Sequence, residues 1–189
     1  MSITDRERKF YGKYRGTVMN NVDPKRVGRL LVAVPDVLTA VPSSWAEPCV
    51  PLAGPTGPPM GVHLIPPIGA GVWIEFEQGD PDYPIWVGCR WGLPTDIPLA
   101  AQLGNPADPN IVIQSLLQNA IIVSDMPPVI PPPVSPPPVP PVGGITLRST
   151  TGASIVVNDL GIFISNGKGA IITMIGPMVT VNNGALVII

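Results

Sequence analysis

Short apolar runs separated by regularly spaced turn residues dominate the last third of the chain, residues 143–189. The runs are rich in Ile, Val, Leu, Thr and Met, and they end at Gly152, Asn158-Asp159, Asn166-Gly167, Gly176-Pro177 and Asn182-Asn183-Gly184. β-Branched runs between such residues are typical of short strands joined by tight turns. The pattern predicts strands that begin near Ile145, Ser154, Gly161, Ala170, Met178 and Ala185, about one every eight residues.

Both faces of these predicted strands are apolar. At the period of two that a strand imposes, Ile155 and Val157 share one face and Val156 lies on the other, and residues 161–165 repeat this alternation. Only three residues of this stretch carry charge: Arg148, Asp159 and Lys168. A ribbon this apolar cannot bury both faces alone, because isolated short strands are marginal in water. We therefore expect several copies to share one core, as repeat β structures do.

An internal repeat extends this pattern toward the N-terminus. Residues 111–125 align without gaps with residues 145–159. The identical pairs are Ile111/Ile145, Ser115/Ser149, Ile121/Ile155, Val123/Val157 and Asp125/Asp159. A chance likeness of two β-rich segments is the alternative. We favour a structural repeat, which predicts that a β-rich shaft begins near residue 110.

A proline-rich tract separates the two copies of the repeat. Proline occupies two thirds of the positions from 127 to 141. Such a tract favours polyproline II, which at ~3.1 Å per residue would span roughly 45 Å if straight. It is either a ligand for an SH3-type groove or a stiff connector between two shaft segments, and its flanks favour the connector.

A second β-rich region precedes the shaft, between residues 13 and 92. Residues 14–20 and 28–35 read as two strands joined by a turn at Asp23-Pro24-Lys25. Further along, Val72, Ile74 and Phe76 alternate with polar neighbours, as in a strand buried on one face. About five short strands with long loops fit a small closed or half-closed barrel.

One ordered series of residues resembles a known family across this region. The series is Tyr14-x-Gly16-x-Val18, Asp23-Pro24, Gly28-Arg29-Leu30, Val34-Pro35, Trp45-Ala46, Gly69-x-Gly71-Val72, Glu75-Phe76-Glu77-x-Gly79-Asp80-Pro81-Asp82-x-Pro84 and Gly88. It is similar to the N-terminal oligonucleotide/oligosaccharide-binding (OB) domain of the phage baseplate assembly protein V family. Those proteins are central spikes of contractile tails, related to the spikes of type VI secretion. The resemblance implies a homotrimer with a collar of OB domains and a projecting C-terminal β-helix.

Departures from the family pattern change the expected partners. Only the short segment 1–12 precedes the barrel, so the hub domain that some relatives carry there is expected to be a separate protein. We expect this chain to bind that hub protein and the tail-tube end. No length remains for a muramidase domain between barrel and shaft. The only histidine is His63, so the His-x-His metal tip of some relatives is absent. We therefore expect a PAAR-type protein to cap an apolar tip made of Leu186, Val187, Ile188 and Ile189; simple closure of the trimer core by these residues is the alternative.

Basic residues are concentrated at the start of the chain, although the net charge is only −2. Eight of the eleven Lys and Arg residues lie in the first 29 positions. We expect a docking surface for the hub or tube, formed by Arg6, Arg8, Lys9, Lys13, Arg15, Lys25 and Arg26. A solvated N-terminal region is the alternative, and residues 1–12 read as a charged tail.

Enzyme chemistry finds little support in the sequence. The acidic residues Glu75, Glu77, Asp80 and Asp82 could be drawn as a glycosidase pair, but they follow strand alternation and a turn. No phosphate loop, zinc cluster or dinucleotide fingerprint occurs, so we expect no enzyme, cofactor or metal. Single-stranded nucleic-acid binding by the OB barrel is the rival function; the acidic balance and the apolar shaft argue against it, and we expect no nucleic-acid partner.

The sequence also bears on export of the protein and on the state of its two cysteines. No signal peptide or transmembrane segment is evident, so a secreted adhesin is disfavoured and assembly in the host cytoplasm is expected. Cys49 and Cys89 show no metal or redox spacing. We expect them to be reduced and buried as small apolar residues, with a disulfide between them as the alternative.

These observations combine into one all-β prediction: an OB-fold barrel followed by an intertwined trimeric β-helix or β-prism shaft, acting as the spike that punctures a cell envelope. The expected boundaries are a tail at 1–12, the OB domain at 13–95, a linker at 96–110, a first shaft segment at 111–126, a connector at 127–142 and the spike at 143–189. The predicted trimer core is Ile111, Ile113, Ile121, Val123, Ile145, Leu147, Ile155, Val157, Ile162, Ile164 and Ile171. The expected location is the baseplate of a virion or phage-like particle.

Overall fold

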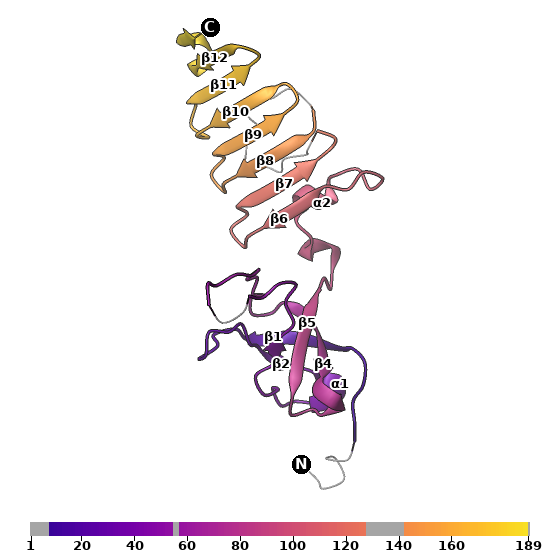
Figure 1. Ribbon diagram of the computed structural model, residues 1–189. Coiled ribbons are helices and arrows are strands. Elements are labelled where there is room, and N and C mark those ends of the chain that lie inside the picture. Colours follow the sequence, from indigo (N-terminus) through magenta and orange to yellow (C-terminus); the bar gives the residue numbers. More distant parts are fainter. Residues whose placement is uncertain (1–7, 55–56, 128–141, 189) are drawn as a thin grey trace. The chain divides into compact units, whose positions relative to one another are not determined.

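The computed structural model describes residues 8–54, 57–127 and 142–188, and it divides the chain into two compact units, residues 1–94 and 95–189 (Figure 1). Both units are built mainly from strands. The predicted connector lies almost wholly outside the described residues, as do Arg6 and Ile189.

The first unit is a curled five-stranded sheet. Its strands are β1 (Tyr14–Asn20), β2 (Leu31–Ala33), β3 (Glu47–Pro48), β4 (Gly71–Phe76) and β5 (Pro84–Arg90), in the order β2-β1-β4-β5-β3. The short helix α1 (Pro35–Leu38) follows β2. Reciprocal backbone hydrogen bonds between Leu30 and Ala46, at 3.1 and 2.7 Å, join the regions beside the two edge strands. These bonds curl the sheet into a half-barrel, in agreement with the predicted OB fold.

The core of this unit fills the inside of the curl. As alternation predicted, Val72, Ile74 and Phe76 all point inward and are buried. They pack with Val18, Leu30, Val32, Val34, Ala46 and Trp86. Gly16 is required on β1 because a Cβ there would lie 2.8 Å from the Ile74 side chain.

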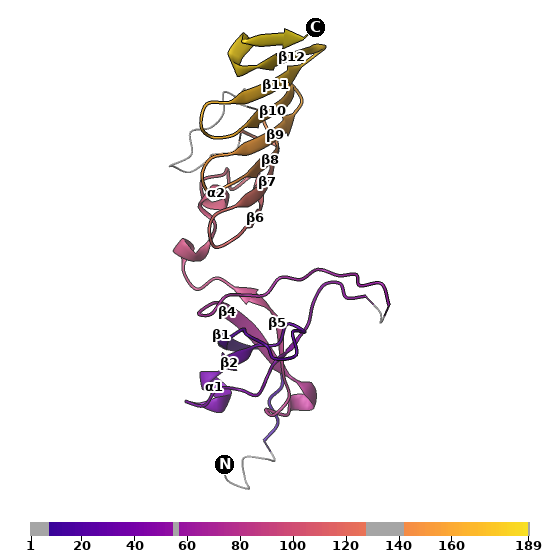
Figure 2. The ribbon, with the colours of Figure 1, turned by 90° about the vertical axis from the view of Figure 1, so that its left-hand side faces the viewer.

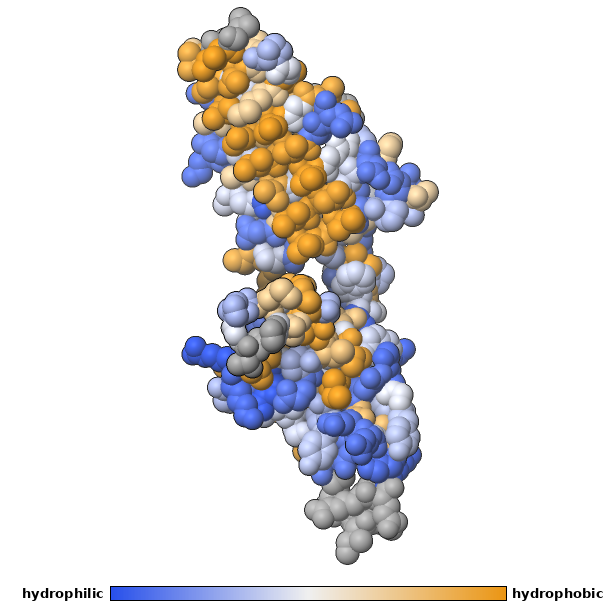
Figure 3. All heavy atoms as spheres, viewed as in Figure 1, coloured by the Kyte–Doolittle hydropathy of each residue, from blue (hydrophilic) through white to orange (hydrophobic). Residues whose placement is uncertain are grey.

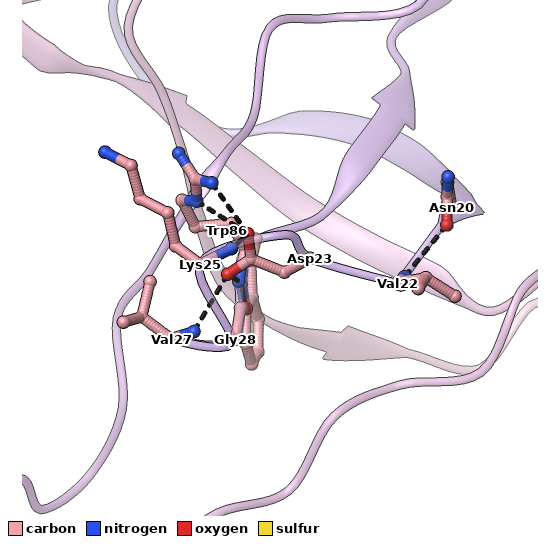
Figure 4. A network of polar contacts seen from close by, with 8 residues as sticks. Asn20, Val22, Asp23, Lys25, Val27, Gly28 and Trp86 are labelled. Atoms are coloured by element: carbon pink, nitrogen blue, oxygen red, sulfur yellow. Dashed lines mark hydrogen bonds and ion pairs between the residues drawn. The ribbon is translucent and has the colours of Figure 1, made fainter.

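A buried acid organises the loop between β1 and β2 (Figure 4). The Asp23 carboxylate accepts hydrogen bonds from the backbone N–H groups of Lys25, Val27 and Arg29, at 3.0, 2.9 and 3.3 Å. It also accepts two bonds from the Arg29 guanidinium, at 3.1 and 2.7 Å. The Arg29 side chain holds the pKa of Asp23 well below its usual range, and the backbone donors act in the same direction. Nearby, Trp86 Nε1 donates to the Gly28 carbonyl at 3.0 Å, so the loop is fixed to the barrel core.

Residues 8–12 lie against the barrel, whereas the sequence indicated a free charged tail as far as residue 12. The Phe10 N–H donates to the Gly79 carbonyl at 2.8 Å. The Phe10 ring contacts those of Tyr14 and Phe76, with centroids 6.1 and 6.2 Å away. An aromatic residue within a charged segment was the signal for this contact.

Both cysteines differ from the sequence expectation of burial. Cys49 and Cys89 are free thiols with exposed side chains. Cys89 lies on β5, which has one solvent-facing side, and Cys49 follows the two-residue edge strand β3. Neither position is covered by the core of the first unit.

The second unit is a ladder of eight antiparallel strands. After the short helices η3 (Pro94–Asp96) and α2 (Leu99–Gln102), the chain forms β6 (Ile111–Gln114), β7 (Ala120–Ser124), β8 (Gly144–Arg148), β9 (Ser154–Asn158), β10 (Gly161–Ser165), β11 (Ile171–Ile175), β12 (Met178–Val181) and β13 (Leu186–Ile188). Strand order follows chain order throughout, which Figures 1 and 2 show as a stack of successive rungs. The predicted strand starts agree with the last six strands, β8 to β13, to within one residue.

The internal repeat is present as two equivalent hairpins. In β6–β7, the Ser115 N–H donates to the Asn119 carbonyl at 2.9 Å, and in β8–β9 the Ser149 N–H donates to the Ala153 carbonyl at 2.8 Å. The serine hydroxyl accepts the return N–H in both hairpins, at 3.2 and 3.1 Å. The shared serine at the start of each five-residue turn therefore has a structural role.

Candidate assembly surface

Two unbroken rows of apolar side chains run across all eight strands of the second unit. Directly opposed residues of an antiparallel pair point to the same face, so the strand register defines each row. Row one is Ile111, Val123, Ile145, Val157, Ile162, Met174, Val179 and Ile188. Row two is Ile113, Ile121, Leu147, Ile155, Ile164, Ile172, Val181 and Leu186. We call the side that carries both rows the row face.

The row face is open to solvent in the single chain. Exposed fractions reach 65% at Ile111 and are still 40% at Ile155 and 54% at Leu186. Figure 3 shows the face as a continuous hydrophobic band along the second unit. Part of row two lines a hollow of about 550 Å3, which Ser115, Asn119 and Ser149 also line. A contiguous apolar face of this extent marks a protein interaction site.

The opposite side of the sheet is different in composition and burial. Its central residues Ile122, Val156 and Phe163 are at most 6% exposed, and Ile122 packs with Ala100 of α2. Polar side chains are interspersed there, including Thr146 and Arg148. This opposite side is therefore buried within its own chain at β7, β9 and β10, whereas on β11 and β12 it leaves Ile175 and Met178 exposed. The row face is the more open of the two.

Comparison with known protein families bears on both units. Residues 14–91 match the type VI secretion system/phage-baseplate injector OB domain, and residues 110–187 match the phage baseplate V C-terminal trimerisation domain. Together the two matches cover most of the chain. The chain belongs to the phage baseplate V family. No curated protein matches it.

Family membership confirms the fold class and the resemblance seen in the sequence, and it assigns the row face to a trimerisation domain. All row residues except Ile188 lie within the matched segment. The family is a structural one of the baseplate, so the protein is not an enzyme. The domain supports a homotrimer.

Ten of the eleven residues predicted for the shaft core lie on the row face. Ile171 does not, because β11 pairs it with Ser165 and thereby places it on the opposite side. The five-residue turn at 166–170 keeps the alternation of Ile162 and Ile164, so Ile172 and Met174 occupy the rows. Reasoning from sequence missed these two residues and Val179 and Val181. The two-residue loop at 176–177 changes the alternation from even to odd positions, which places Val179 and Val181 in the rows.

The rows end at the last strand. Leu186 and Ile188 are exposed, 54% and 56%, and they form the final members of rows two and one. They belong to the tip predicted from the sequence. The side chains of Val187 and Ile189 lie outside the described residues.

Several of the basic residues predicted for docking have partners within the first unit. Lys9 lies 3.7 Å from Asp80, and Lys13 forms an ion pair with Glu75. Arg8 lies over the Phe10 ring, 5.3 Å from its centroid. The other three described members, Arg15, Lys25 and Arg26, are exposed.

The acidic residues that could be drawn as a catalytic pair have structural partners. Glu75 and Asp80 are the ion-pair partners of Lys13 and Lys9, and Asp80 also accepts the Asp82 N–H at 3.1 Å in the turn before β5. Across the described ranges, no three His, Cys, Asp or Glu side chains are grouped to hold a metal. In the same ranges, no helix combines the length and hydropathy required for a membrane span.

Proposed function

We propose that three copies of this chain form the central spike of a contractile tail, in a phage or a related injection system, and that the spike pierces the target envelope when the sheath contracts. The observation that carries the proposal is the row face: sixteen apolar side chains in two continuous rows, within a domain whose family is named for trimerisation. In an isolated chain these apolar side chains would remain in contact with water, which is unfavourable.

Three such sheets can close into a prism that buries every row. Each wall presents its row face to the axis, and each wall completes the core that the other two lack. Burying the remaining exposed area of a half-exposed Val, Leu or Ile contributes roughly 1 kcal/mol. The rows therefore favour closure by on the order of 10 kcal/mol per protomer, before the entropic cost of association is subtracted.

The ladder also suits a shaft that transmits force. The turns along its edges are short and hydrogen bonded: Asp159-Leu160 and Gly176-Pro177 are two-residue loops between paired strands. The Thr150 N–H donates to Asn119 Oδ1 at 3.2 Å, which ties one turn to the next. Contraction of the sheath supplies the work, and a closed core of this kind resists fraying under load.

The remaining partners follow from the two ends of the chain. The exposed basic residues of the first unit, among them Arg15, Lys25 and Arg26, are available to bind a separate hub protein and the tail-tube end. Leu186 and Ile188 leave an apolar tip, for which a PAAR-type cap is a suitable partner. The spike would then reside at the baseplate.

Electron microscopy of assembled particles tests this function. Particles are assembled with the wild-type chain or with Ile155→Asp, which places three carboxylates in the proposed core, and the chain is located with a gold-labelled antibody. We expect wild-type label at the distal end of the tail, and variant particles that lack it and fail to puncture target cells. Label along the sheath, or full puncturing activity of the variant, would overturn the proposal.

A further inference from the structure

Charge is sorted between the two long edges of the eight-stranded sheet. Between residues 110 and 189 the sequence holds four charged residues: Asp125, Arg148, Asp159 and Lys168. One edge, which we call the basic edge, carries Lys168 and adjoins Arg148 at the end of β8. It is formed by turns 115–119, 149–153, 166–170 and 182–185. The other edge, which we call the acidic edge, carries Asp125 and Asp159. It is formed by residues 125–127, 159–160 and 176–177.

Cyclic assembly brings these two edges together. In a three-fold ring of identical walls, contacts between neighbours are head to tail, so one edge of each wall meets the opposite edge of the next. This step rests on the proposed trimer with its row faces turned inward. The basic edge of each protomer then runs beside the acidic edge of its neighbour.

The charged residues of the two edges also lie at matching positions along the ladder of strands. Asp125 directly follows β7, and Arg148 ends β8, one strand further on. Asp159 lies between β9 and β10, and Lys168 lies between β10 and β11, again one strand further on. Both pairs therefore share one offset of about 4.8 Å, the spacing of neighbouring strands. A single sliding of one edge against the other brings both pairs together.

Within the described residues, none of these four charges has a counter-ion in its own chain. The ion pairs found there involve other residues. Asp159 and Lys168 are exposed at their turns. Arg148 is only 6% exposed, and its Nε and Nη1 atoms have no hydrogen-bond partner in the described part of the chain. Because this side chain is covered by its own chain, Arg148 acts on a neighbour through its charge beside the basic edge and not through a direct contact.

We propose that the acidic edge of one protomer pairs with the basic edge of the next, with Asp159 beside the neighbour's Lys168 and Asp125 beside the neighbour's Arg148. Exposed ion pairs contribute little stability. Their value here is specificity, because a slip of one strand along the axis removes both pairs while leaving the apolar rows in contact. The partner is a second copy of this chain.

Disulfide trapping tests the edge contact. The test protein is the full chain with Cys49→Ser and Cys89→Ser, to which Asp159→Cys and Lys168→Cys are added. Within one chain these positions are separated by the length of β10, about 17 Å, so a disulfide between them must join two protomers. The control combines Asp125→Cys with Lys168→Cys, which the proposed register leaves two strands apart, or about 10 Å along the axis, beyond the reach of a disulfide.

On a non-reducing gel of samples heated in SDS to dissociate the assembly, mild oxidation should give a covalent trimer of the test protein and leave the control as monomers. A trimeric mass in solution without the cross-link, or an equal cross-link in the control, would overturn the edge pairing and leave the trimeric spike intact. A monomeric mass under reducing conditions would contradict the trimer itself. As a second measurement, Lys168→Glu should lower the melting temperature at low salt, and adding Asp159→Lys should restore it; no restoration would contradict the contact.

Discussion

Ile155 and Ile175 form a matched pair that separates a face buried by neighbouring copies from a face open to water. The two residues are of one type, lie in the same sheet and have similar exposed fractions, 40% and 44%. Ile155 belongs to row two, whereas Ile175 lies on the opposite side of the sheet, because Ile172 and Met174 occupy the rows on β11. Replacing either by alanine makes the same change in β-propensity and in side-chain volume.

The two substitutions should differ strongly in effect if the row face is a trimer core. Truncating a fully buried Ile to Ala costs about 2–5 kcal/mol, and Ile155→Ala acts three times in each trimer, for a loss on the order of 10 kcal/mol. Ile175→Ala should cost about 1 kcal/mol per chain, as partly exposed sites do. In an isolated chain the two variants should lose similar amounts.

The assay is thermal unfolding followed by circular dichroism at two protein concentrations, with mass measured by light scattering. Ile155→Ala should lower the melting temperature far more than Ile175→Ala, and its melting temperature should fall on dilution, because assembly and folding are coupled. Equal losses for the two variants, independent of concentration, would refute the reasoning that the row face is buried by other copies.

Three further predictions concern individual residues. Asp23→Asn should destabilise the protein at neutral pH. Because the pKa of Asp23 is lowered in the folded state, the advantage of the wild type should shrink as pH falls below about 4. A difference in melting temperature that stays constant from about pH 7 to about pH 2 would contradict the ion pair. Gly167→Ala should lower the melting temperature more than Gly169→Ala. Both glycines have positive φ, but only at Gly167 would a Cβ meet the backbone of the neighbouring turn, at 2.6 Å. Equal losses for the two variants would argue against that contact. Cys49 and Cys89 should both react with a maleimide in the native protein, Cys89 more slowly because burial raises the pKa of its thiol; protection of both would contradict their exposure.

Much of the shaft could be predicted from the sequence because its signals are local. Turn residues at Asn158-Asp159 and Gly176-Pro177 bound the strands directly, and alternation assigns faces within each strand. The likeness of segments 111–125 and 145–159 predicted that β6 and β7 form a unit equivalent to β8 and β9. Alternation within a strand does not by itself define the conformation of a five-residue turn, so Ile171 was assigned to the core, whereas the strand pairing continues the alternation of Ile162 and Ile164 to Ile172.

In the first unit the misses come from contacts between residues distant in sequence. Phe10 is held by Gly79 and Phe76, which lie far along the chain, so its charged neighbours suggested a tail. Exposure of Cys49 and Cys89 follows from where β3 and β5 lie in the sheet, which composition cannot show. The ion pairs of Lys9 with Asp80 and of Lys13 with Glu75 are likewise contacts between residues distant in sequence.

The mass of the full-length protein in solution tests the central claim most directly. The chain weighs 19.8 kDa. Light scattering on the purified protein should give three times that mass, and the assembly should survive mild SDS because its apolar rows are closed from water. A particle with the mass of a single chain and an exposed row face would contradict the account.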